Sequence, residues 1–369
     1  MKGLIHLVVG ARPNFVKAFP VYKALKNNKK FGVEVVYTMQ HQRQQMSLDF
    51  ASRIGLPSQG LMLKNTQPMG GIAQTSSIMR QYGEVLESRK PNWTIVFGDI
   101  SSALACAYAS KTCGVRVAHI ESGLRCRNIF MVEEINRRAI DSISDFKWTT
   151  LPSATTNLIS EGHNPNTVSE VGNTMIDTMR MLMPTILNSR ILMKLGLKSQ
   201  EYLLLTFHRK ENTSDKDILI DLIESLKQLP QSLKIVFSVH PRTLQKINEW
   251  KLLNSLYSSK NILVIDPLDY TEFINLLLNS CLVITDSGGV QEEATALGLK
   301  SLIVRGETER IETLESGFSE LIDLPNLNER VRQLTSSFTK KREVHQSQTF
   351  NLWDGHAAER ILRDVMENF

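Results

Sequence analysis

The chain has 369 residues, of which 42% are hydrophobic and 22% are charged, and its formal net charge is +5. This length favours two domains, and the composition is that of an ordinary soluble globular protein. The basic residues are scattered and no zinc-finger spacing occurs, so nucleic acid is not an expected partner. No apolar run approaches the roughly 18 residues of a membrane span, and no signal peptide is recognisable. We therefore expect a cytoplasmic protein without membrane association.

Short runs rich in Val, Ile and Leu recur along the chain, separated by longer stretches with helical spacing. Four lie in the first half, at 4–10, 33–39, 93–99 and 115–122, and five in the second, at 202–208, 233–240, 261–267, 281–287 and 300–306. Their apolar residues are continuous rather than alternating, which is typical of parallel strands buried on both faces. Two such clusters predict two doubly wound, Rossmann-like α/β domains.

The stretch 177–200 has helical spacing and a proline at 184, and we interpret it as the connection between the domains. We accordingly assign residues 1–176 to an N-terminal domain and 177–354 to a C-terminal domain. The closing segment 355–369 predicts an amphipathic helix.

Four cysteines, at positions 106, 113, 126 and 281, form no CxxC pair. This pattern favours reduced thiols in an intracellular protein over a disulfide framework. Cys126 differs from the others because it lies in a polar segment that we expect to be functional.

Polar side chains follow nearly every predicted strand. In the first half these are Arg12 with Lys17, Gln40 with His41, Gly98 with Asp99, and His119 with Glu121 and Arg125. In the second half they are His208–Arg209, His240 with Arg242, Asp269–Tyr270, Asp286–Gly289, and Arg305 with Glu309–Arg310. Any one of them alone is typical of a helix cap or an exposed ion pair. Because ligands bind beyond the carboxyl ends of parallel strands, the whole set predicts an active site.

Residues 284–299, ITDSGGVQEEATALGL, predict a strand that leads through a Gly-rich turn into a helix. Such a turn is commonly no more than a capped connection. The backbone N–H groups of Gly288 and Gly289 could instead bind a diphosphate, and Glu293 could accept hydrogen bonds from a ribose. GxGxxG and GxxxxGK[ST] are absent, so neither a redox dinucleotide nor a P-loop hydrolase is expected. HExxH-type spacing is absent too, and we expect no metal and no cofactor.

An ordered series of motifs covers essentially the whole chain: GARPNFVK, QHQRQQMS, GDISS, HIESGLR, VEEINRR, VGNTMID, FHRKEN, HPRT, PLDYTEF, TDSGGVQEE, RGETER and DGHAAERI. Together they resemble the non-hydrolysing UDP-N-acetylglucosamine 2-epimerases. The resemblance implies a GT-B-type fold, in which two Rossmann-like halves face a central cleft. It also implies that the helix 355–369 crosses back to complete the N-terminal domain, and that the protein is a homodimer.

The resemblance further implies a reaction, the interconversion of UDP-GlcNAc and UDP-ManNAc for polysaccharide biosynthesis. In this family the C2 proton is removed and UDP is expelled anti, which leaves 2-acetamidoglucal. UDP adds back after the glucal has been protonated on its other face. Because the C2 hydrogen is barely acidic, this chemistry needs carboxylates as acid and base, and cations that stabilise UDP as it leaves.

By motif, the resemblance gives acid–base roles to Asp99, Glu121 and Glu133, and a diphosphate contact to His208, which we include among the catalytic residues. It places Phe273 near the uracil and Glu293 at the ribose. With the strand-end residues added, the predicted substrate-binding set is Arg12, Lys17, Arg137, His240, Phe273, Ser287, Gly288, Gly289, Glu293 and Arg310.

Three segments depart from the common family pattern. Met39–Arg43 differs in a region that members activated by a second UDP-GlcNAc use for that purpose, so activation of this protein by UDP-GlcNAc stays an open question. Met131–Val132 replaces the usual proline before the paired glutamates, so the segment 126–132 is expected to shape the sugar pocket differently. Ile311 stands where the family has proline after TER.

Several alternatives stay open. The QHxxxxMS form and the short loop after GLR resemble a sister branch that epimerises UDP-2,3-diacetamido-2,3-dideoxyglucuronic acid, whereas QEE and TER favour the N-acetylglucosamine branch. A hydrolysing 2-epimerase, which releases ManNAc and UDP, would use the same carboxylates. A GT-B glycosyltransferase would have little use for three carboxylates around C2. A non-catalytic sugar-nucleotide sensor would have lost one of them.

Overall fold

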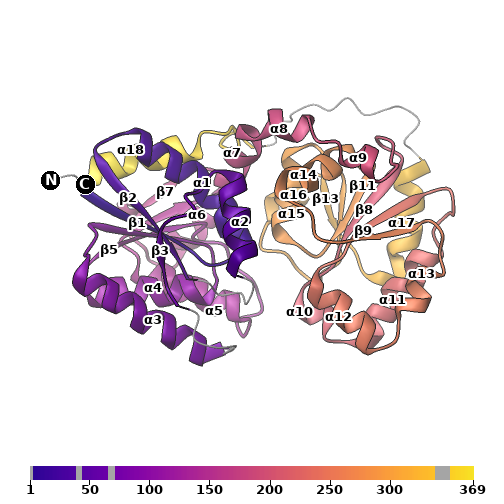
Figure 1. Ribbon diagram of the computed structural model, residues 1–369, viewed down its shortest axis with the longest axis horizontal. Helices are drawn as coiled ribbons and strands as arrows, with labels where there is room; N and C mark the ends of the chain where they lie inside the picture. The colour runs from indigo at the N-terminus through magenta and orange to yellow at the C-terminus, as the bar shows by residue number, and fades with distance from the viewer. Residues whose placement is uncertain (1–2, 39–43, 65–70, 337–349) are drawn as a thin grey trace. The chain divides into compact units, whose positions relative to one another are not determined.

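The computed structural model describes residues 3–38, 44–64, 71–336 and 350–369. The chain divides into two compact units: unit 1 is Met1–Met181 with Phe350–Phe369, and unit 2 is Leu182–Thr349 (Figure 1). Each unit has a parallel sheet with helices on both faces, which confirms the two predicted α/β domains.

Unit 1 contains a sheet in the order β3-β2-β1-β4-β5-β6-β7, and every pairing in it is parallel. Leu7 is paired with Val35 on one side and with Ile95 on the other. The strands are β1 (Gly3–Val9), β2 (Phe31–Tyr37), β3 (Leu61–Met62), β4 (Trp93–Phe97), β5 (Arg116–Ile120), β6 (Phe146–Thr149) and β7 (Val168–Glu170).

Helices cover both faces of this sheet. Side chains of α3, α4 and α5 pack with strand residues in one apolar cluster, while α1 lies with α18 on the other face (Figure 1). The helices are α1 (Arg12–Asn27), α2 (Gln44–Ile54), α3 (Gly71–Ser88), α4 (Ser101–Thr112), α5 (Val132–Ile143), α6 (Pro152–Ser160), α7 (Thr174–Met181) and α18 (Ala357–Asn368), with a 3-10 turn at Pro165–Thr167.

The closing helix α18 belongs to unit 1, where it packs on α1 and α7. Its first amides are capped by Asp177 of α7, which accepts from the N–H of Ala357 at 3.2 Å and of Ala358 at 2.7 Å. A carboxylate at this position satisfies orphan N–H groups and suits the helix dipole.

Unit 2 has the sheet order β10-β9-β8-β11-β12-β13. Its strands are β8 (Tyr202–Thr206), β9 (Lys234–Ser238), β10 (Ile262–Ile265), β11 (Leu282–Thr285), β12 (Ser301–Ile303) and β13 (Ser319–Leu321). Its helices are α8 (Met183–Leu187), α9 (Ile191–Lys194), α10 (Lys210–Thr213), α11 (Lys216–Lys227), α12 (Pro241–Glu249), α13 (Leu253–Tyr257), α14 (Tyr270–Asn279), α15 (Gly288–Ala296), α16 (Ile311–Glu315) and α17 (Leu324–Ser336).

Both sheets share one topological feature. With the strands numbered within each unit, the order begins 3-2-1-4, so the chain builds the sheet outward in one direction up to the third strand and in the opposite direction from the fourth. In unit 1 this reversal lies between β1 and β4, and in unit 2 between β8 and β11. Sheets with this reversal bind their ligands in a crevice at the carboxyl ends of the strands at this point. Among the residues that the structure describes, no helix is both long and apolar enough to cross a membrane.

Candidate active site

The crevice of unit 1 begins where β1 turns into α1. A Cβ added at Gly10 would lie 2.4 Å from Ser102 Oγ and 2.6 Å from Thr38 Oγ1, so the turn leaves no room for a side chain. Helix α1 then starts at Arg12, whose guanidinium lies 4.2 Å from the ring centroid of Phe50. The tight turn therefore brings the start of α1 close to the end of the sheet.

Glu121 follows β5 in a left-handed backbone conformation, with φ of 69°. For a residue other than glycine this conformation costs roughly 1 kcal/mol or more, and such strain is concentrated at functional sites. The buried carboxylate forms an ion pair with Lys17, one turn into α1. A Cβ added at Gly98 would lie 3.0 Å from Glu121 Oε2 and 3.6 Å from Lys17 Nζ. The ends of β4 and β5 and the start of α1 thus meet at this ion pair.

Asp99, directly after Gly98, is held by helix α5. Its carboxylate forms an ion pair with Arg137, whose side chain is only 2% exposed, and its backbone carbonyl accepts from Asn136 at 2.8 Å. Arg137 also donates to Glu134 at 2.8 Å. Asp99 and Glu121 therefore both sit opposite a cation, one from α5 and one from α1.

The two neighbouring glutamates of α5 have opposite environments. Glu134 is fully buried and accepts hydrogen bonds from Arg137, from Arg138 at 2.7 Å and from the N–H of Cys126 at 3.0 Å. Glu133 is exposed in the first turn of the helix, where the dipole favours a negative charge. The sequence analysis did not identify Glu134. Its position one helical turn before Arg137 was the signal that could have done so.

In unit 2, Asp286 organises the crevice between β8 and β11. The carboxylate is fully buried and accepts from the backbone N–H of His208 at 3.0 Å and of Arg209 at 2.8 Å, and from the side chain of Asn212 at 3.1 Å. Burial raises the pKa of Asp286, but its hydrogen bonds and the charge of His208 outweigh burial and lower it. Asp286 was noted at a strand end but was not predicted as a site residue.

The imidazole of His208 is oriented by the same carboxylate, because its Nδ1 lies 3.1 Å from Asp286 Oδ1. The ring of His240 lies beside it, with 5.8 Å between the ring centroids. His240 caps α12 by accepting from the N–H of Arg242 at 3.2 Å. The structure thus brings the two predicted histidines together at one edge of the unit 2 sheet.

The Gly-rich turn places the start of α15 in the same crevice. Ser287 is the N-cap, and its hydroxyl accepts from the N–H of Val290 at 3.4 Å. The helix begins at Gly288, so Glu293 lies in its second turn. A Cβ added at Gly288 would lie 2.5 Å from Nη1 of Arg310, which shows how closely this guanidinium packs on the backbone. A helix N-terminus beside a guanidinium favours an anion.

Buried carboxylates hold Arg310 in place. Its Nε lies 2.9 Å from Glu292, and Nη1 forms an ion pair with Glu309. Glu309 also lies 3.0 Å from the buried guanidinium of Arg305. These contacts fix the cation before any ligand binds.

The predicted uracil and ribose positions lie on α14 and α15. Glu293 is buried, and Tyr270 lies beside it, so that burial and the nearby charge of Glu293 raise the pKa of Tyr270 well above its usual range. Phe273 is half-buried one turn further along α14. Gly289 follows Gly288 in the first turn of α15.

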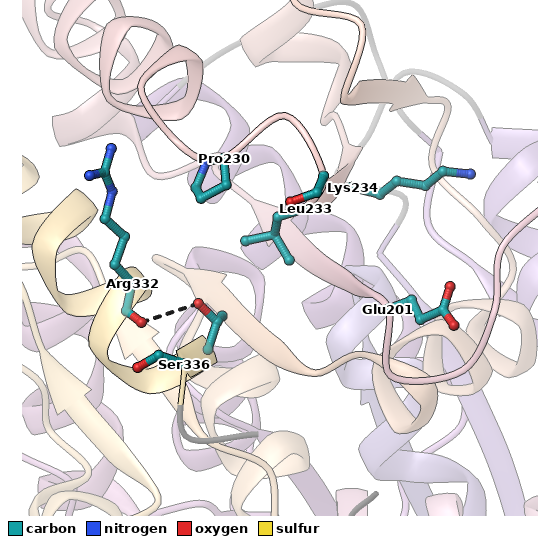
Figure 2. Close-up of a pocket in the computed structure, with 8 residues that line it drawn as sticks. Glu201, Pro230, Leu233, Lys234, Arg332 and Ser336 are labelled. Carbon is teal, nitrogen blue, oxygen red and sulfur yellow. Dashed lines mark hydrogen bonds between the residues drawn. The ribbon is translucent and has the colours of Figure 1, made fainter. Parts of the chain in front are cut away.

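A cavity of about 610 Å³ lies at the opposite edge of the unit 2 sheet, where β8 and β9 begin (Figure 2). It is lined by Glu201, Pro230, Ser232, Leu233, Lys234, Arg332, Thr335 and Ser336, and by no predicted site residue. The strand-end residues Gln40 and His41, and the departure at Met39–Arg43, lie outside the residues that the structure describes.

Comparison with known proteins agrees with this fold. The family model described as UDP-N-acetylglucosamine 2-epimerase matches residues 23–366. The chain is 33% identical to the UDP-N-acetylglucosamine 2-epimerase of Methanocaldococcus jannaschii, over 97% of this chain and 98% of that protein. It is 35% identical to the UDP-2,3-diacetamido-2,3-dideoxy-D-glucuronate 2-epimerase of Pseudomonas aeruginosa, over 85% and 87% of the two chains.

Among solved structures, the Methanocaldococcus jannaschii UDP-GlcNAc 2-epimerase in complex with UDP-GlcNAc and UDP matches with a TM-score of 0.88 and 31% identity, and 99% of each chain is covered. The sequence match and the shared fold agree. The chain belongs to the UDP-N-acetylglucosamine 2-epimerase family of isomerases.

Proposed function

We propose that this protein is a non-hydrolysing epimerase that interconverts UDP-GlcNAc and UDP-ManNAc. The observation that carries the proposal is the group formed by Asp99, Glu121, Lys17 and Arg137 at the switch point of unit 1. Relatives named as UDP-N-acetylglucosamine 2-epimerases over nearly the whole chain support it.

The reaction would proceed by elimination and re-addition. A carboxylate takes the proton from C2, the electron pair forms the C1–C2 double bond, and the C1–O bond to UDP breaks on the opposite face. The intermediates are 2-acetamidoglucal and UDP. Protonation of C2 on its other face and attack of a UDP oxygen on C1 then give the epimer. Proton transfer on two faces of the sugar requires separately placed acid–base groups. Asp99 follows β4, Glu121 follows β5 and Glu133 lies on α5.

Unit 2 would bind the nucleotide and stabilise it as a leaving group. The start of α15, at Ser287, Gly288 and Gly289, offers backbone N–H groups for the diphosphate. His208 and Arg310 supply donors or positive charge as negative charge develops on the phosphate, with His240 beside His208. In unit 1, Arg12 is a further proposed substrate-binding residue. Phe273 would contact the uracil and Glu293 the ribose.

The test is to incubate the protein with UDP-GlcNAc in deuterated water and to follow C1 and C2 by proton NMR. We expect UDP-ManNAc with deuterium at C2 and no accumulation of free sugar. ManNAc together with UDP would mean a hydrolysing enzyme. If Asp99→Asn and Glu121→Gln turned over as fast as wild type, the assigned site would be wrong.

The second candidate substrate is UDP-2,3-diacetamido-2,3-dideoxyglucuronic acid. It is favoured by the 35% identity to the Pseudomonas aeruginosa enzyme named for that sugar. The same NMR experiment decides between the two. Tight UDP binding without conversion of UDP-GlcNAc, but with conversion of the diacetamido sugar, would establish the second substrate.

We further propose that the protein acts as a cytoplasmic homodimer in polysaccharide biosynthesis. The family resemblance supports this assembly, and the UDP-sugar substrate is consistent with such a compartment. Sedimentation velocity would test the assembly. A monomer at micromolar concentration would contradict it.

A further inference from the structure

His119 is fully buried on β5, two residues before Glu121, and both of its ring nitrogens have partners. Nε2 lies 2.9 Å from the carbonyl oxygen of Gly98, and Nδ1 lies 2.6 Å from Oδ1 of Asp141 on α5. A carbonyl and a carboxylate can only accept, whereas a neutral imidazole carries a single N–H. If Asp141 is ionised, both nitrogens must therefore be protonated.

The surroundings of Asp141 favour its ionised form. Its Oδ2 accepts from the N–H of Gly123 at 3.1 Å and from Arg125 at 2.8 Å. The alternative is a neutral Asp141 carboxyl that donates to Nδ1 of an uncharged His119 ring. In that state Arg125 would lose the negative charge of Asp141 as its partner.

Other ionisable groups lie near the pair. Glu161 on the far side of Arg125 accepts from it at 2.7 and 2.6 Å. Lys147 on β6, which is in register with His119, donates to a backbone carbonyl, and its pKa is lowered by burial. Glu121 itself is paired with Lys17. Asp141 is thus the anion that faces His119 directly.

The pair holds both turns around Glu121. His119 binds the carbonyl of Gly98, where φ is +62°, and Asp141 binds the amide of Gly123, where φ is +79°. Glu121, itself left-handed, lies two residues before Gly123, and its Oε2 would lie 3.0 Å from a Cβ added at Gly98. We propose that His119 is a buried imidazolium that, with Asp141, forms a positioning dyad for the turns that carry Asp99 and Glu121. The consequence for turnover rests on the proposed function, but the protonation state does not.

The protonation state can be measured in the wild-type protein without substrate. With ring-¹⁵N-labelled histidine at pH 7, we expect both nitrogens of His119 to give shifts of protonated nitrogen. His119→Gln identifies the signals by their loss; if that variant does not fold, the response to Asp141→Asn identifies them. One unprotonated nitrogen in the wild-type ring would overturn the imidazolium.

Asp141→Asn tests the positioning. The amide oxygen can accept from Gly123 and Arg125 while the NH₂ donates to Nδ1 of an uncharged ring, so every hydrogen bond keeps a partner but loses the charge that strengthens it, and the turns are held less firmly. We expect a folded protein in which one nitrogen of His119 is unprotonated, kcat is lowered at least about tenfold and the affinity for UDP is unchanged.

Asp145→Asn is the matched control. It removes a carboxylate of the same unit that bonds Lys111 and the N–H of Val117 rather than His119, and its kcat should stay near wild type. A folded Asp141→Asn protein with wild-type kcat would overturn the positioning role. Failure of the wild type to epimerise any UDP-sugar would refute the proposed function and leave the NMR result standing.

Discussion

The adjacent residues Glu133 and Glu134 give a sharp test of the active-site assignment, because the structure places one in solvent and the other in the interior. We predict that Glu133→Gln abolishes most of the turnover at little cost in stability. Glu134→Gln should instead lower the free energy of unfolding, and it should lower turnover only through the groups that it holds.

The expected magnitudes follow from the contacts. Glu133→Gln loses a favourable helix-dipole interaction of about 0.3–1 kcal/mol, whereas loss of a general acid or base lowers kcat by about 10²–10⁴-fold. Glu134 accepts three hydrogen bonds, one of them from Arg137, which is 2% exposed. Glutamine can keep one acceptor, so we expect a loss of about 2–3 kcal/mol, near the value of one or two charged hydrogen bonds.

Urea unfolding gives the stabilities, and deuterium incorporation at C2 of UDP-GlcNAc gives the activities. Measuring both on the two variants separates a chemical role from a structural one. If Glu133→Gln exchanged the C2 hydrogen at the wild-type rate, Glu133 would not be an acid–base group. If the free energy of unfolding of Glu133→Gln were as low as that of Glu134→Gln, the exposed position of Glu133 and the buried position of Glu134 would be wrong.

Three further predictions concern other parts of the structure. Asp286→Asn should weaken UDP binding about tenfold, because His208 loses a charged hydrogen bond worth about 1.5 kcal/mol. An unchanged affinity in calorimetry would contradict the role of Asp286 in orienting His208. Gly98→Ala should lower kcat at least about tenfold, because the new Cβ would crowd the carboxylate of Glu121 and alanine would strain the left-handed backbone at position 98. A wild-type rate in steady-state kinetics would argue against close packing between Gly98 and Glu121. Burial raises the pKa of Asp177 to about 6, so the unfolding free energy of wild type minus that of Asp177→Asn should be largest below about pH 4 and should fall by about 3 kcal/mol as the pH rises through 6. A difference that stays constant with pH in urea unfolding would disprove the shift.

The sign for Asp177 follows from linkage. Its folded pKa lies above the unfolded value of about 3.9, so the folded protein binds the extra proton between these pH values. The stabilisation is complete below about pH 4 and is lost as the pH rises through the folded pKa. The two backbone N–H groups at the start of α18 oppose this shift but are outweighed by burial.

Much of the fold was predictable because each of the nine strand segments carries a continuous apolar run, and all nine are strands in the structure. The four strands that were missed, β3, β6, β7 and β13, are two to four residues long. Lys147 in β6 and Glu170 in β7 also interrupt the apolar pattern. In strands this short, pairing with a neighbour rather than local sequence decides the structure.

The strand-end rule identified Asp99, Glu121 and His208 as candidates because the carboxyl ends of parallel strands share one edge of a sheet. The partners of these residues were not predictable in the same way. The burial of Glu134 and the contact between Lys17 and Glu121 depend on how each helix is rotated about its axis. A helix with polar residues on several faces does not fix that rotation from sequence alone. The catalytic and binding roles themselves stay predictions.

Backbone strain separates the two crevices. In unit 1, three left-handed residues follow β4 and β5, Gly98, Glu121 and Gly123, and of these three only Glu121 is strained, because glycine adopts a positive φ freely. Other left-handed residues of this unit, such as Lys29 and Gly55, lie away from the carboxyl ends of the strands. In the described part of unit 2, the left-handed residues lie away from those ends, at Gly196, Gln200, Lys251, Gly298 and Gly317. Proton transfer depends on the placement of a carboxylate to within fractions of an ångström, which can justify a strained backbone, whereas a helix N-terminus binds a phosphate without strain. The distribution of strain therefore favours proton chemistry in unit 1 and nucleotide binding in unit 2.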